Sequence, residues 1–290
     1  MRCQSTDPDR ELGVHMAAQD ARAHADSAIV AQMDFCIPGE KVIFYPSERE
    51  KSQWPYRPHE VRIADVRPIA DELRLERNGF VLVERASAVS NFYDPAEVER
   101  VYIPEVVDLV TELTGADKVV TFGTMLRTDA KNAAQANQPA FGAHVDYGNR
   151  TVRQFATDLL GTEEAERRLR GRYMLINVWR PITVVRRTPF AVCDAGTVHA
   201  SDLNDSEVRG GLGDPNRPTL YGYSVSFNPN QRWYYVPNMR PEEVLAFKLF
   251  DSDSSAVQWT AHSAFEHPDT DPAAPPRESI EIRTISFFEP

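Results

Sequence analysis

The chain has 290 residues, of which 42% are hydrophobic and 26% charged, a composition typical of a soluble globular protein. Its net charge of −11 argues against nucleic acid as a partner, because phosphate binding depends on clustered Lys and Arg, and no apolar run approaches the roughly 18 residues that a membrane helix needs. The 3 scattered cysteines indicate a reducing, cytoplasmic location rather than a disulfide framework, which leaves small molecules as the expected partners.

Residues 1–29 carry acidic side chains and lack the apolar segment of a secretory signal, so we expect a loosely packed N-terminal extension. Residues 30–290 are predicted to form a single domain, since a chain of this length can bury one substantial core. Neither an internal repeat nor a long low-complexity segment divides this part of the sequence.

The first elements after the extension are short. Residues 47–59 are punctuated by Pro and Ser and are predicted to form a surface loop. Residues 61–83 predict a strand, a polar helical piece and a second strand in succession. Residues 94–114 predict a helix, because apolar residues recur there at i, i+3, i+4 and i+7. Asp94 is its expected N-cap, and Pro104 is expected to kink or split it.

The second half of the chain is rich in short runs of β-branched and aromatic residues, which predict an all-β sandwich or barrel. Two helices are expected to interrupt it, at 158–172 and at 241–252, the latter because Pro241 opens it and acidic residues follow. Residues 204–218 are predicted to form a second surface loop. The expected architecture is therefore mainly β with supporting helices. The predicted strands are 118–127, 173–182, 190–195, 219–227, 232–239 and 279–288.

His144 and Asp146 lie two positions apart in the segment AFGAHVDYGN. Residues i and i+2 of a strand point to the same side, so both side chains can converge on one ion. A mononuclear non-haem iron(II) site needs two neutral imidazoles and one carboxylate, with further positions open to other ligands and dioxygen. The pair supplies two of these three ligands, and the third has to come from a distant strand.

His199 and His262 are the two candidates for the third ligand. His262 has the better context, because Arg277 and Ser279 follow it at the start of the last predicted strand. Strand alternation sends both of these side chains to the same face, where a guanidinium and a hydroxyl can together hold a carboxylate. A metal ligand and an anion clamp would then share one cavity.

An ordered series of motifs runs through residues 30–290. It comprises Asp65-x-Arg67, Asn78-Gly79-Phe80, Thr114-Gly115-Ala116, His144-Val-Asp146-Tyr147, Asn177-Val-Trp179-Arg180-Pro181, Arg232-Trp233-Tyr234-Tyr235, Phe247-Lys248, Asp251-Ser252, His262-Ser-Ala-Phe265 and Pro276-Arg277-Glu-Ser279-Ile-Glu281-Ile-Arg283. This series resembles the iron(II)- and 2-oxoglutarate-dependent oxygenases of the gibberellin desaturase and cephem methoxylase group, which are tailoring enzymes of secondary metabolism. The ordered series is more specific than any one motif in it.

The resemblance implies a double-stranded β-helix core of the jelly-roll, cupin-like type, with His144, Asp146 and His262 as iron ligands. It also implies that 2-oxoglutarate chelates the iron(II) through its 2-oxo acid end. Dioxygen would then oxidise 2-oxoglutarate to succinate and carbon dioxide, and the substrate would be hydroxylated or desaturated. The protein would position the target C–H bond and keep water out.

The resemblance further implies that an arginine near the start of the last strand binds the distal carboxylate of 2-oxoglutarate. Arg277 together with Ser279 is the expected pair, on the spacing given above. Arg283 lies on the same strand face and is a rival for the role.

Within the group, the bacterial cephem methoxylase component resembles this chain in length and in its Arg- and Ala-rich composition. This likeness implies a cephalosporin, a β-lactam, as substrate, hydroxylated at its 7α position in cephamycin-type antibiotic biosynthesis. It also implies a separate methyltransferase as partner, which completes the methoxy group. The same chemistry on another metabolite is the alternative, because enzymes of this group differ in substrate while keeping their motifs.

Five further residues are candidates for contact with the substrate, the co-substrate or an iron ligand: Tyr147, Asn177, Arg180, Trp233 and Tyr235. For Arg180 the structural alternative is a salt bridge, with Glu281 as the partner. For the aromatic run that contains Trp233 and Tyr235 the alternative is packing in the core. Tyr147 is equally explained as a half-buried residue at the barrel rim.

Two functions other than an oxygenase stay open on the sequence alone. One is a non-catalytic, cupin-like protein that holds a small acid through Arg277 or Arg283. The other is a metal-dependent enzyme of the same barrel class that does not use 2-oxoglutarate. No Gly-rich phosphate loop, GxSxG elbow or HExxH motif is present to support a nucleotide-binding, hydrolase or zincin function.

Overall fold

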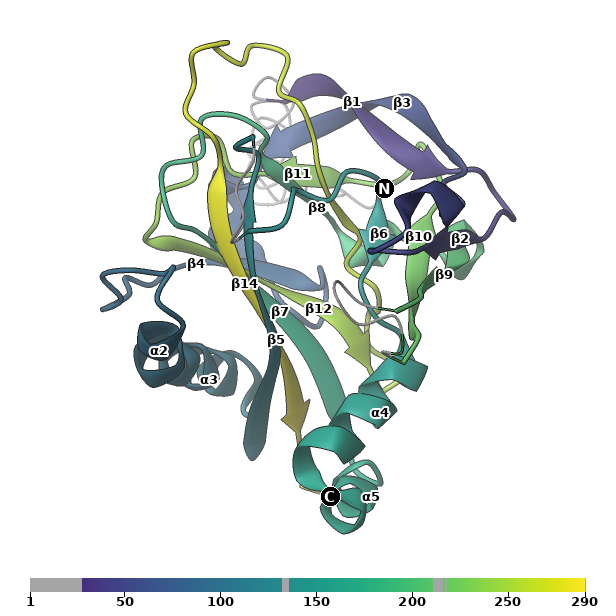
Figure 1. Cartoon of the computed structure of the whole chain (residues 1–290), viewed down its shortest axis with the longest axis vertical. Coiled ribbons are helices and arrows are strands. Elements are labelled where there is room, and N and C mark those ends of the chain that lie inside the picture. The colour runs from purple at the N-terminus through teal and green to yellow at the C-terminus, as the bar shows by residue number, and fades with distance from the viewer. Residues whose placement is uncertain (1–27, 132–135, 211–215, 217, 290) are drawn as a thin grey trace, which may run out of the picture.

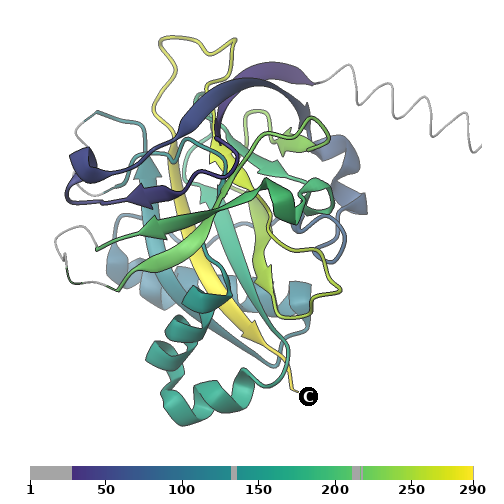
Figure 2. The same ribbon diagram turned by 90° about the vertical axis from the view of Figure 1, so that its right-hand side faces the viewer.

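The computed structural model describes residues 28–131, 136–210, 216 and 218–289. The strands form two curled sheets, with helices at one side and at one end (Figures 1 and 2). The larger sheet runs in the order β1 (Ile29–Cys36), β3 (Tyr56–Asp65), β11 (Trp233–Tyr235), β8 (Phe190–Cys193), β13 (His262–Ala264), β6 (His144–Val145), β10 (Leu220–Val225), β9 (Leu203–Val208) and β2 (Val42–Phe44). The smaller runs in the order β4 (Phe80–Glu84), β12 (Glu243–Asp251), β7 (Tyr173–Pro181), β14 (Glu278–Phe287) and β5 (Lys118–Thr128).

The core lies between the two sheets. All nine residues of β7 are buried, because one face of the strand meets the larger sheet while the other is covered from outside. Trp179 of β7 stacks on Phe190 of β8 with ring centroids 4.9 Å apart, and this contact joins the sheets. The predicted mainly-β, double-stranded β-helix core of the jelly-roll type is confirmed.

The predicted helix at 94–114 covers the outer face of the smaller sheet, where α3 (Ile103–Thr114) packs on β14 and β5 (Figure 1). Its N-cap is confirmed, since the carboxylate of Asp94 accepts a hydrogen bond from the backbone N–H of Ala96 at 3.0 Å. The helix is divided, as Pro104 predicts: a short α2 (Pro95–Glu97) and a π-helical turn (Val98–Tyr102) precede α3.

The predicted helix at 241–252 is wrong, because this segment forms strand β12 between β4 and β7. Both faces of β12 are buried, so its apolar run carries no alternation that separates a strand from a helix. Pro241 and the acidic residues that follow precede a strand here. Glu243 turns its carboxylate to Arg67, which donates to it through Nε at 2.8 Å and Nη2 at 2.9 Å.

Other boundaries also differ from the predictions, among them the strand expected at 232–239, which is confined to β11 (Trp233–Tyr235). The loop expected at 204–218 contains most of β9, whose polar side chains find partners: Nδ2 of Asn204 donates to Oγ of Ser226 at 2.7 Å. The helix expected at 158–172 begins earlier and is two helices, α4 (Asn149–Leu160) and α5 (Thr162–Arg168), which are divided at a left-handed Gly161. The loop expected at 47–59 ends where β3 begins.

Four 3₁₀ turns complete the described elements: Arg49–Lys51, Arg67–Glu72, Ala195–Thr197 and Ala200–Asp202. Most of the predicted N-terminal extension, residues 1–27, lies outside the described residues, and β1 begins at Ile29, the last residue of that predicted extension. None of the helices in the described ranges is long and apolar enough to cross a membrane.

Candidate active site

His144 and His262 lie opposite each other on neighbouring strands of the larger sheet. The two strands, β6 and β13, are antiparallel and pair at these two residues, and the imidazole centroids are 4.4 Å apart. Asp146 follows the end of β6, and one ligand atom from each of the three side chains lies within 4.8 Å of the other two. The structure therefore brings together the three residues that the sequence singled out as iron ligands. His199, the rival for the third position, is exposed in a loop and outside this cluster.

Backbone carbonyls orient both imidazoles. Nδ1 of His144 lies 2.8 Å from the carbonyl oxygen of Gly142, and Nδ1 of His262 lies 3.1 Å from that of Thr260. Since a carbonyl only accepts, each Nδ1 carries the proton and donates it, which leaves the Nε2 lone pairs free for a metal. These Nε2 atoms lie 3.6 and 3.8 Å from the carboxylate oxygens of Asp146.

The two oxygens of Asp146 have different surroundings. Oδ2 accepts hydrogen bonds from Nε of Arg283 at 3.0 Å and from Nδ2 of Asn177 at 3.3 Å. Oδ1 is the oxygen that faces Nε2 of His144. Oδ2, which the smaller sheet holds, lies 3.8 Å from Nε2 of His262, while Oδ1 lies 3.6 Å from Nε2 of His144. Outer hydrogen bonds of this kind fix a carboxylate ligand for a metal.

The charge states at the cluster suit a divalent cation. Burial on its own would raise the pKa of Asp146, but the positive charge of Arg283 and the nearby imidazoles of both histidines outweigh it and hold this pKa well below its usual range. Burial, together with the nearby His144, lowers the pKa of His262. An ionised carboxylate and neutral imidazoles are the forms that bind metals.

A glycine in the larger sheet allows the chain to bring Asp146 into place. Gly222 of β10 packs directly on the backbone carbonyls of Val145 and Asp146, and a Cβ at this position would lie 2.6 Å from the carbonyl oxygen of Val145. A larger residue would push β10 away from the turn that carries the carboxylate. No motif in the sequence marks Gly222.

A narrow cavity between the two sheets opens beside the cluster. Two of the residues that line it have a buried donor without a hydrogen-bond partner among the described residues, Arg277 at Nε and Trp179 at Nε1, and so has Ser279 at Oγ, two positions after Arg277. Unsatisfied buried donors are rare in folded proteins and here mark a place for an acceptor. The cavity is lined by Arg127, Ala140, His144, Trp179, Phe190, His262, Ala264, Arg277 and Glu281.

Arg277 is 1% exposed and forms no ion pair with a carboxylate among the described residues. Glu281, which lines the same cavity, pairs instead with Arg127 and Arg283. Burial, and then the charge of Arg127, lowers the pKa of Arg277 to about 9. A buried guanidinium without a counter-ion is costly and is stabilised by an anionic ligand.

Arg283, the rival of Arg277, is occupied by other partners. Its Nε donates to Asp146 and its Nη2 donates to Glu281 at 2.8 Å. Both acids raise the pKa of Arg283 well above its usual value, against the effect of burial. Arg283 therefore supports Asp146 through a hydrogen bond, whereas Arg277 lines the cavity and has a donor without a partner among the described residues.

The five further candidates lie in different places. Asn177 contacts Asp146, and the ring of Tyr147 lies 5.4 Å from the guanidinium carbon of Arg283, so both are beside the cluster. Trp233 and Tyr235 are buried in the larger sheet, where they pack on other aromatic rings and do not line the cavity beside the candidate iron ligands.

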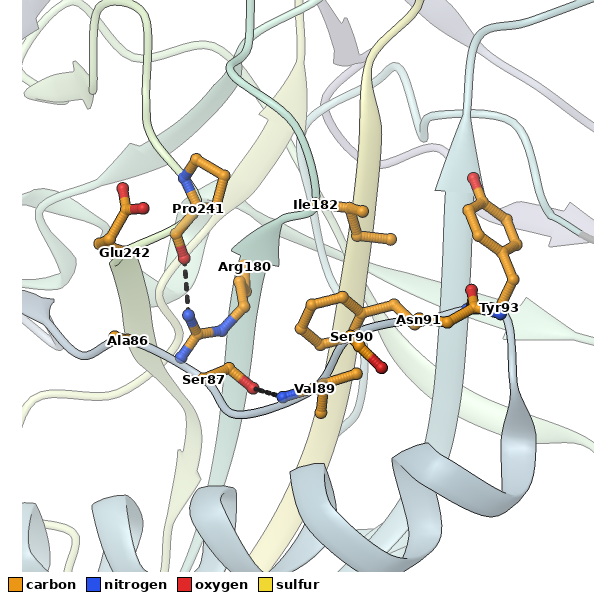
Figure 3. Close-up of a pocket in the computed structure, with 11 residues that line it drawn as sticks. Ala86, Ser87, Val89, Ser90, Asn91, Tyr93, Arg180, Ile182, Pro241 and Glu242 are labelled. Carbon is orange, nitrogen blue, oxygen red and sulfur yellow. Dashed lines mark hydrogen bonds between the residues drawn. The ribbon is translucent and has the colours of Figure 1, made fainter.

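Arg180 faces away from the cluster, because it lies three positions from Asn177 on β7 and strand alternation sends it to the outer face. It lines a separate cavity of about 260 Å³ under the loop before α2 (Figure 3). Its Nη1 donates to the carbonyl of Pro241 at 2.6 Å, and its Nε donates to the hydroxyl of Tyr102 at 3.3 Å. The expected salt bridge with Glu281 is not formed.

Comparison with known proteins places the chain in a family. A family model described as an oxidoreductase/YMDC permease-like domain matches residues 34–287. The chain is 34% identical over 243 residues to the Fe(II)/2-oxoglutarate-dependent dioxygenase nvfI of Aspergillus novofumigatus, covering 82% of this chain and 86% of that protein. It is 33% identical over 258 residues to the hydroxylase/desaturase efuI of Hormonema carpetanum, covering 81% and 85%.

A solved structure agrees with the sequence relatives. The iron and alpha-ketoglutarate-dependent endoperoxidase NvfI superposes on this chain with a TM-score of 0.80 at 31% identity, covering 91% of this chain and all of that one. Alpha-ketoglutarate is another name for 2-oxoglutarate, so the structural and the sequence comparisons indicate the same co-substrate. With two imidazoles and a carboxylate assembled between two jelly-roll sheets, the chain belongs to the family of iron(II)- and 2-oxoglutarate-dependent dioxygenases.

Proposed function

We propose that the protein is a hydroxylase or desaturase of secondary metabolism that oxidises a small molecule at the expense of 2-oxoglutarate and dioxygen. The observation that carries the proposal is the pairing of two features in one place: the His144, Asp146 and His262 cluster, and the buried, uncompensated guanidinium of Arg277 on the cavity beside it. The first fits a divalent iron ion and the second fits the distal carboxylate of a dicarboxylic co-substrate.

His144, Asp146 and His262 would hold the iron. Their donor set is two neutral nitrogens and one carboxylate oxygen, and it leaves positions open for a chelating 2-oxo acid and for dioxygen. When bound, iron(II) and 2-oxoglutarate supply the oxidising chemistry. The chain's part is to fix the ligands: Arg283 and Asn177 hold the carboxylate.

Arg277 and Ser279 would bind the distal carboxylate of 2-oxoglutarate. Nε of Arg277 and Oγ of Ser279 are buried and lack partners, so a carboxylate there restores the hydrogen bonds that both atoms lack. Trp179 lines the cavity beside Arg277, and its indole Nε1 is a third buried donor without a partner among the described residues. The sequence analysis did not single out Trp179 as a site residue, although it lies two positions after Asn177 in the same strand motif.

Apolar rings cover His262, which is buried. Phe247 of β12 and Phe190 of β8 lie with ring centroids 4.8 and 5.5 Å from that of His262. A dry surrounding strengthens the electrostatic contacts within the site and limits side reactions of the oxidant with water.

The substrate is the open part of the proposal. The named relatives include a hydroxylase/desaturase and an endoperoxidase, and none of those named above is a cephem methoxylase. This favours the same chemistry on a metabolite other than a cephalosporin. The 7α-hydroxylation of a cephalosporin, with a methyltransferase as partner, stays a prediction that these relatives do not support.

Turnover tests the proposal. The purified protein with Fe(II), ascorbate and 2-oxoglutarate is incubated with a panel of secondary metabolites that includes cephalosporin C, and succinate is measured. We expect succinate release to rise above the uncoupled rate with a substrate, with one oxygen atom gained or two hydrogens lost in the product. Metal and 2-oxoglutarate binding without succinate formation under any condition would favour a non-catalytic small-acid-binding protein instead.

A further inference from the structure

Two residues outside the cavity lining hold Arg277 in place. Nη1 of Arg277 donates to the backbone carbonyl of Thr188 at 2.9 Å, and the backbone N–H of Arg277 donates to Oδ1 of Asp129 at 2.7 Å. The hydroxyl of Thr188 donates to Oδ2 of the same aspartate at 2.6 Å. Arg277, Thr188 and Asp129 thus form a closed ring of three hydrogen bonds, which fixes both the backbone and the side chain of the arginine.

Thr188 has an unfavourable backbone conformation. Its φ is +49°, in the left-handed region that β-branched residues avoid, and Pro189 follows it, which further restricts the backbone. The residue is buried, so the segment cannot relax toward solvent. A strained residue persists only where its surroundings fix it, and such residues cluster at ligand sites.

The carboxylate of Asp129 holds Thr188 in this strained conformation. Its carboxylate accepts from the hydroxyl of Thr188 and also from Nε of Arg187 at 2.7 Å. Burial opposes ionisation of Asp129, but hydrogen bonds from Thr188, Arg187 and the backbone of Arg277 lower its pKa below the usual value. The carboxylate is therefore charged at neutral pH and holds the strained turn and the arginine together.

These contacts restrict the orientation of the Arg277 guanidinium. The hydrogen bond from Nη1 to the Thr188 carbonyl restrains the guanidinium, while Nε has no partner among the described residues. A planar fork recognises a carboxylate only when its plane is fixed correctly, and a small misplacement weakens such a contact strongly.

We propose that Asp129 and Thr188 are positioning residues for the co-substrate: they aim the guanidinium of Arg277 at the distal carboxylate of 2-oxoglutarate. This inference rests on the proposed function. The strained segment at Thr188 then influences the affinity for 2-oxoglutarate and has no role in iron binding.

The test compares two substitutions of one side chain. Thr188→Val keeps the size and branching but removes the hydroxyl, whereas Thr188→Ser keeps the hydroxyl. Affinity for 2-oxoglutarate is measured by anaerobic titration of the Fe(II) protein, followed by the visible charge-transfer band of the chelate, and Fe(II) affinity is measured separately. We expect Thr188→Val to weaken 2-oxoglutarate about tenfold, with Thr188→Ser close to wild type and Fe(II) affinity unchanged in both.

A second ligand distinguishes a specific effect on the orientation of Arg277 from a general disturbance of the site. 2-Oxovalerate has the 2-oxo acid and the chain length of 2-oxoglutarate but no distal carboxylate, so it does not use Arg277. We expect Thr188→Val to leave its affinity unchanged. Equal losses for both ligands, or no loss of 2-oxoglutarate affinity, would overturn the inference.

Asp129→Asn provides a second test if the Thr188→Val protein does not fold. It keeps the shape of the side chain but removes the charge that holds the turn, and we expect the same selective loss of 2-oxoglutarate affinity. Wild-type protein that shows no chelate band at all would contradict the proposed function. A normal wild-type band with unaltered 2-oxoglutarate affinity in the folded variants would overturn only the role of Asp129 and Thr188.

Discussion

Arg283 donates from Nε to Oδ2 of Asp146 at 3.0 Å, and this contact links the last strand of the smaller sheet to a candidate iron ligand on the larger one. Asn177, paired with Arg283 across β7 and β14, donates to the same oxygen. The two donors occupy one carboxylate oxygen and leave the other facing His144. The orientation of the aspartate therefore depends on both sheets.

Substitution of Arg283 tests this support. We expect Arg283→Gln to weaken Fe(II) binding by about 10- to 100-fold, because the loss of an outer hydrogen bond to a metal ligand typically has that effect. Arg180→Gln is the matched control, since Arg180 is equally buried but lies on the opposite face of the sheet. The Fe(II) affinity of both variants is measured by competition with a chromophoric chelator. Equal losses in the two would show that Arg283 acts through stability alone.

The ligand assignment predicts a second pattern. His144→Ala and His262→Ala remove an imidazole from the cluster, so each should abolish stoichiometric iron binding. His199→Ala should leave it intact, because that residue is exposed and outside the cluster. Iron content after reconstitution and desalting is the measurement. Retention of a full equivalent of iron by the His262 variant would move the third ligand elsewhere.

Substitution of Gly222 provides a third prediction, which tests the position of Asp146 without changing any candidate iron ligand. A Cβ at this position meets the backbone carbonyls of Val145 and Asp146, so Gly222→Ala should shift the turn that carries the carboxylate. We expect weaker Fe(II) binding, together with destabilisation by about 1 to 3 kcal/mol. Thermal unfolding and iron titration are followed in parallel. Wild-type affinity in this variant would show that the strand yields without moving Asp146.

Acid stability can be tested at the pair of the half-buried Arg67 and the buried Glu243. Burial opposes ionisation of Glu243, but its bonds to Arg67 and to the backbone N–H of Arg240 outweigh this and lower its pKa. A depressed pKa contributes stability above the unfolded value of about 4.3, and this stability is lost as the pH falls through the folded value.

Glu243→Gln should therefore destabilise the protein at pH 7 by about 1 to 2 kcal/mol, because the partly exposed Arg67 screens the pair, and the difference from wild type should shrink below pH 4. Urea unfolding at several pH values measures it. A difference that is independent of pH would show that the pair contributes through packing only.

The sequence predicted the fold class and the residues of the cluster because both leave local patterns. Runs of β-branched and aromatic residues mark β7 and β14, and His144 with Asp146 occupies two positions of one strand end. The partner His262 was chosen from its position before Arg277, which is again a sequence relationship.

What the sequence could not predict depends on contacts between distant segments. Pro241 and the acidic residues after it predict a helix where β12 lies, and the apolar run does not correct this, because a strand buried on both faces has no alternating pattern. The different tasks of Arg277 and Arg283 follow from which acids lie near each guanidinium, and residues on one strand face look equivalent in sequence. The close approach of Gly222 to Asp146 likewise exists only in the fold.

The most direct test of the account is an anaerobic titration of the Fe(II) protein with 2-oxoglutarate, monitored by the visible band of the metal chelate. We expect the band in wild type and its absence in Asp146→Ala. We also expect Arg277→Ala to need about thirtyfold more 2-oxoglutarate or higher, since breaking a buried charge pair costs about 2 to 5 kcal/mol. Folded wild-type protein with bound iron and no band would contradict the proposed site.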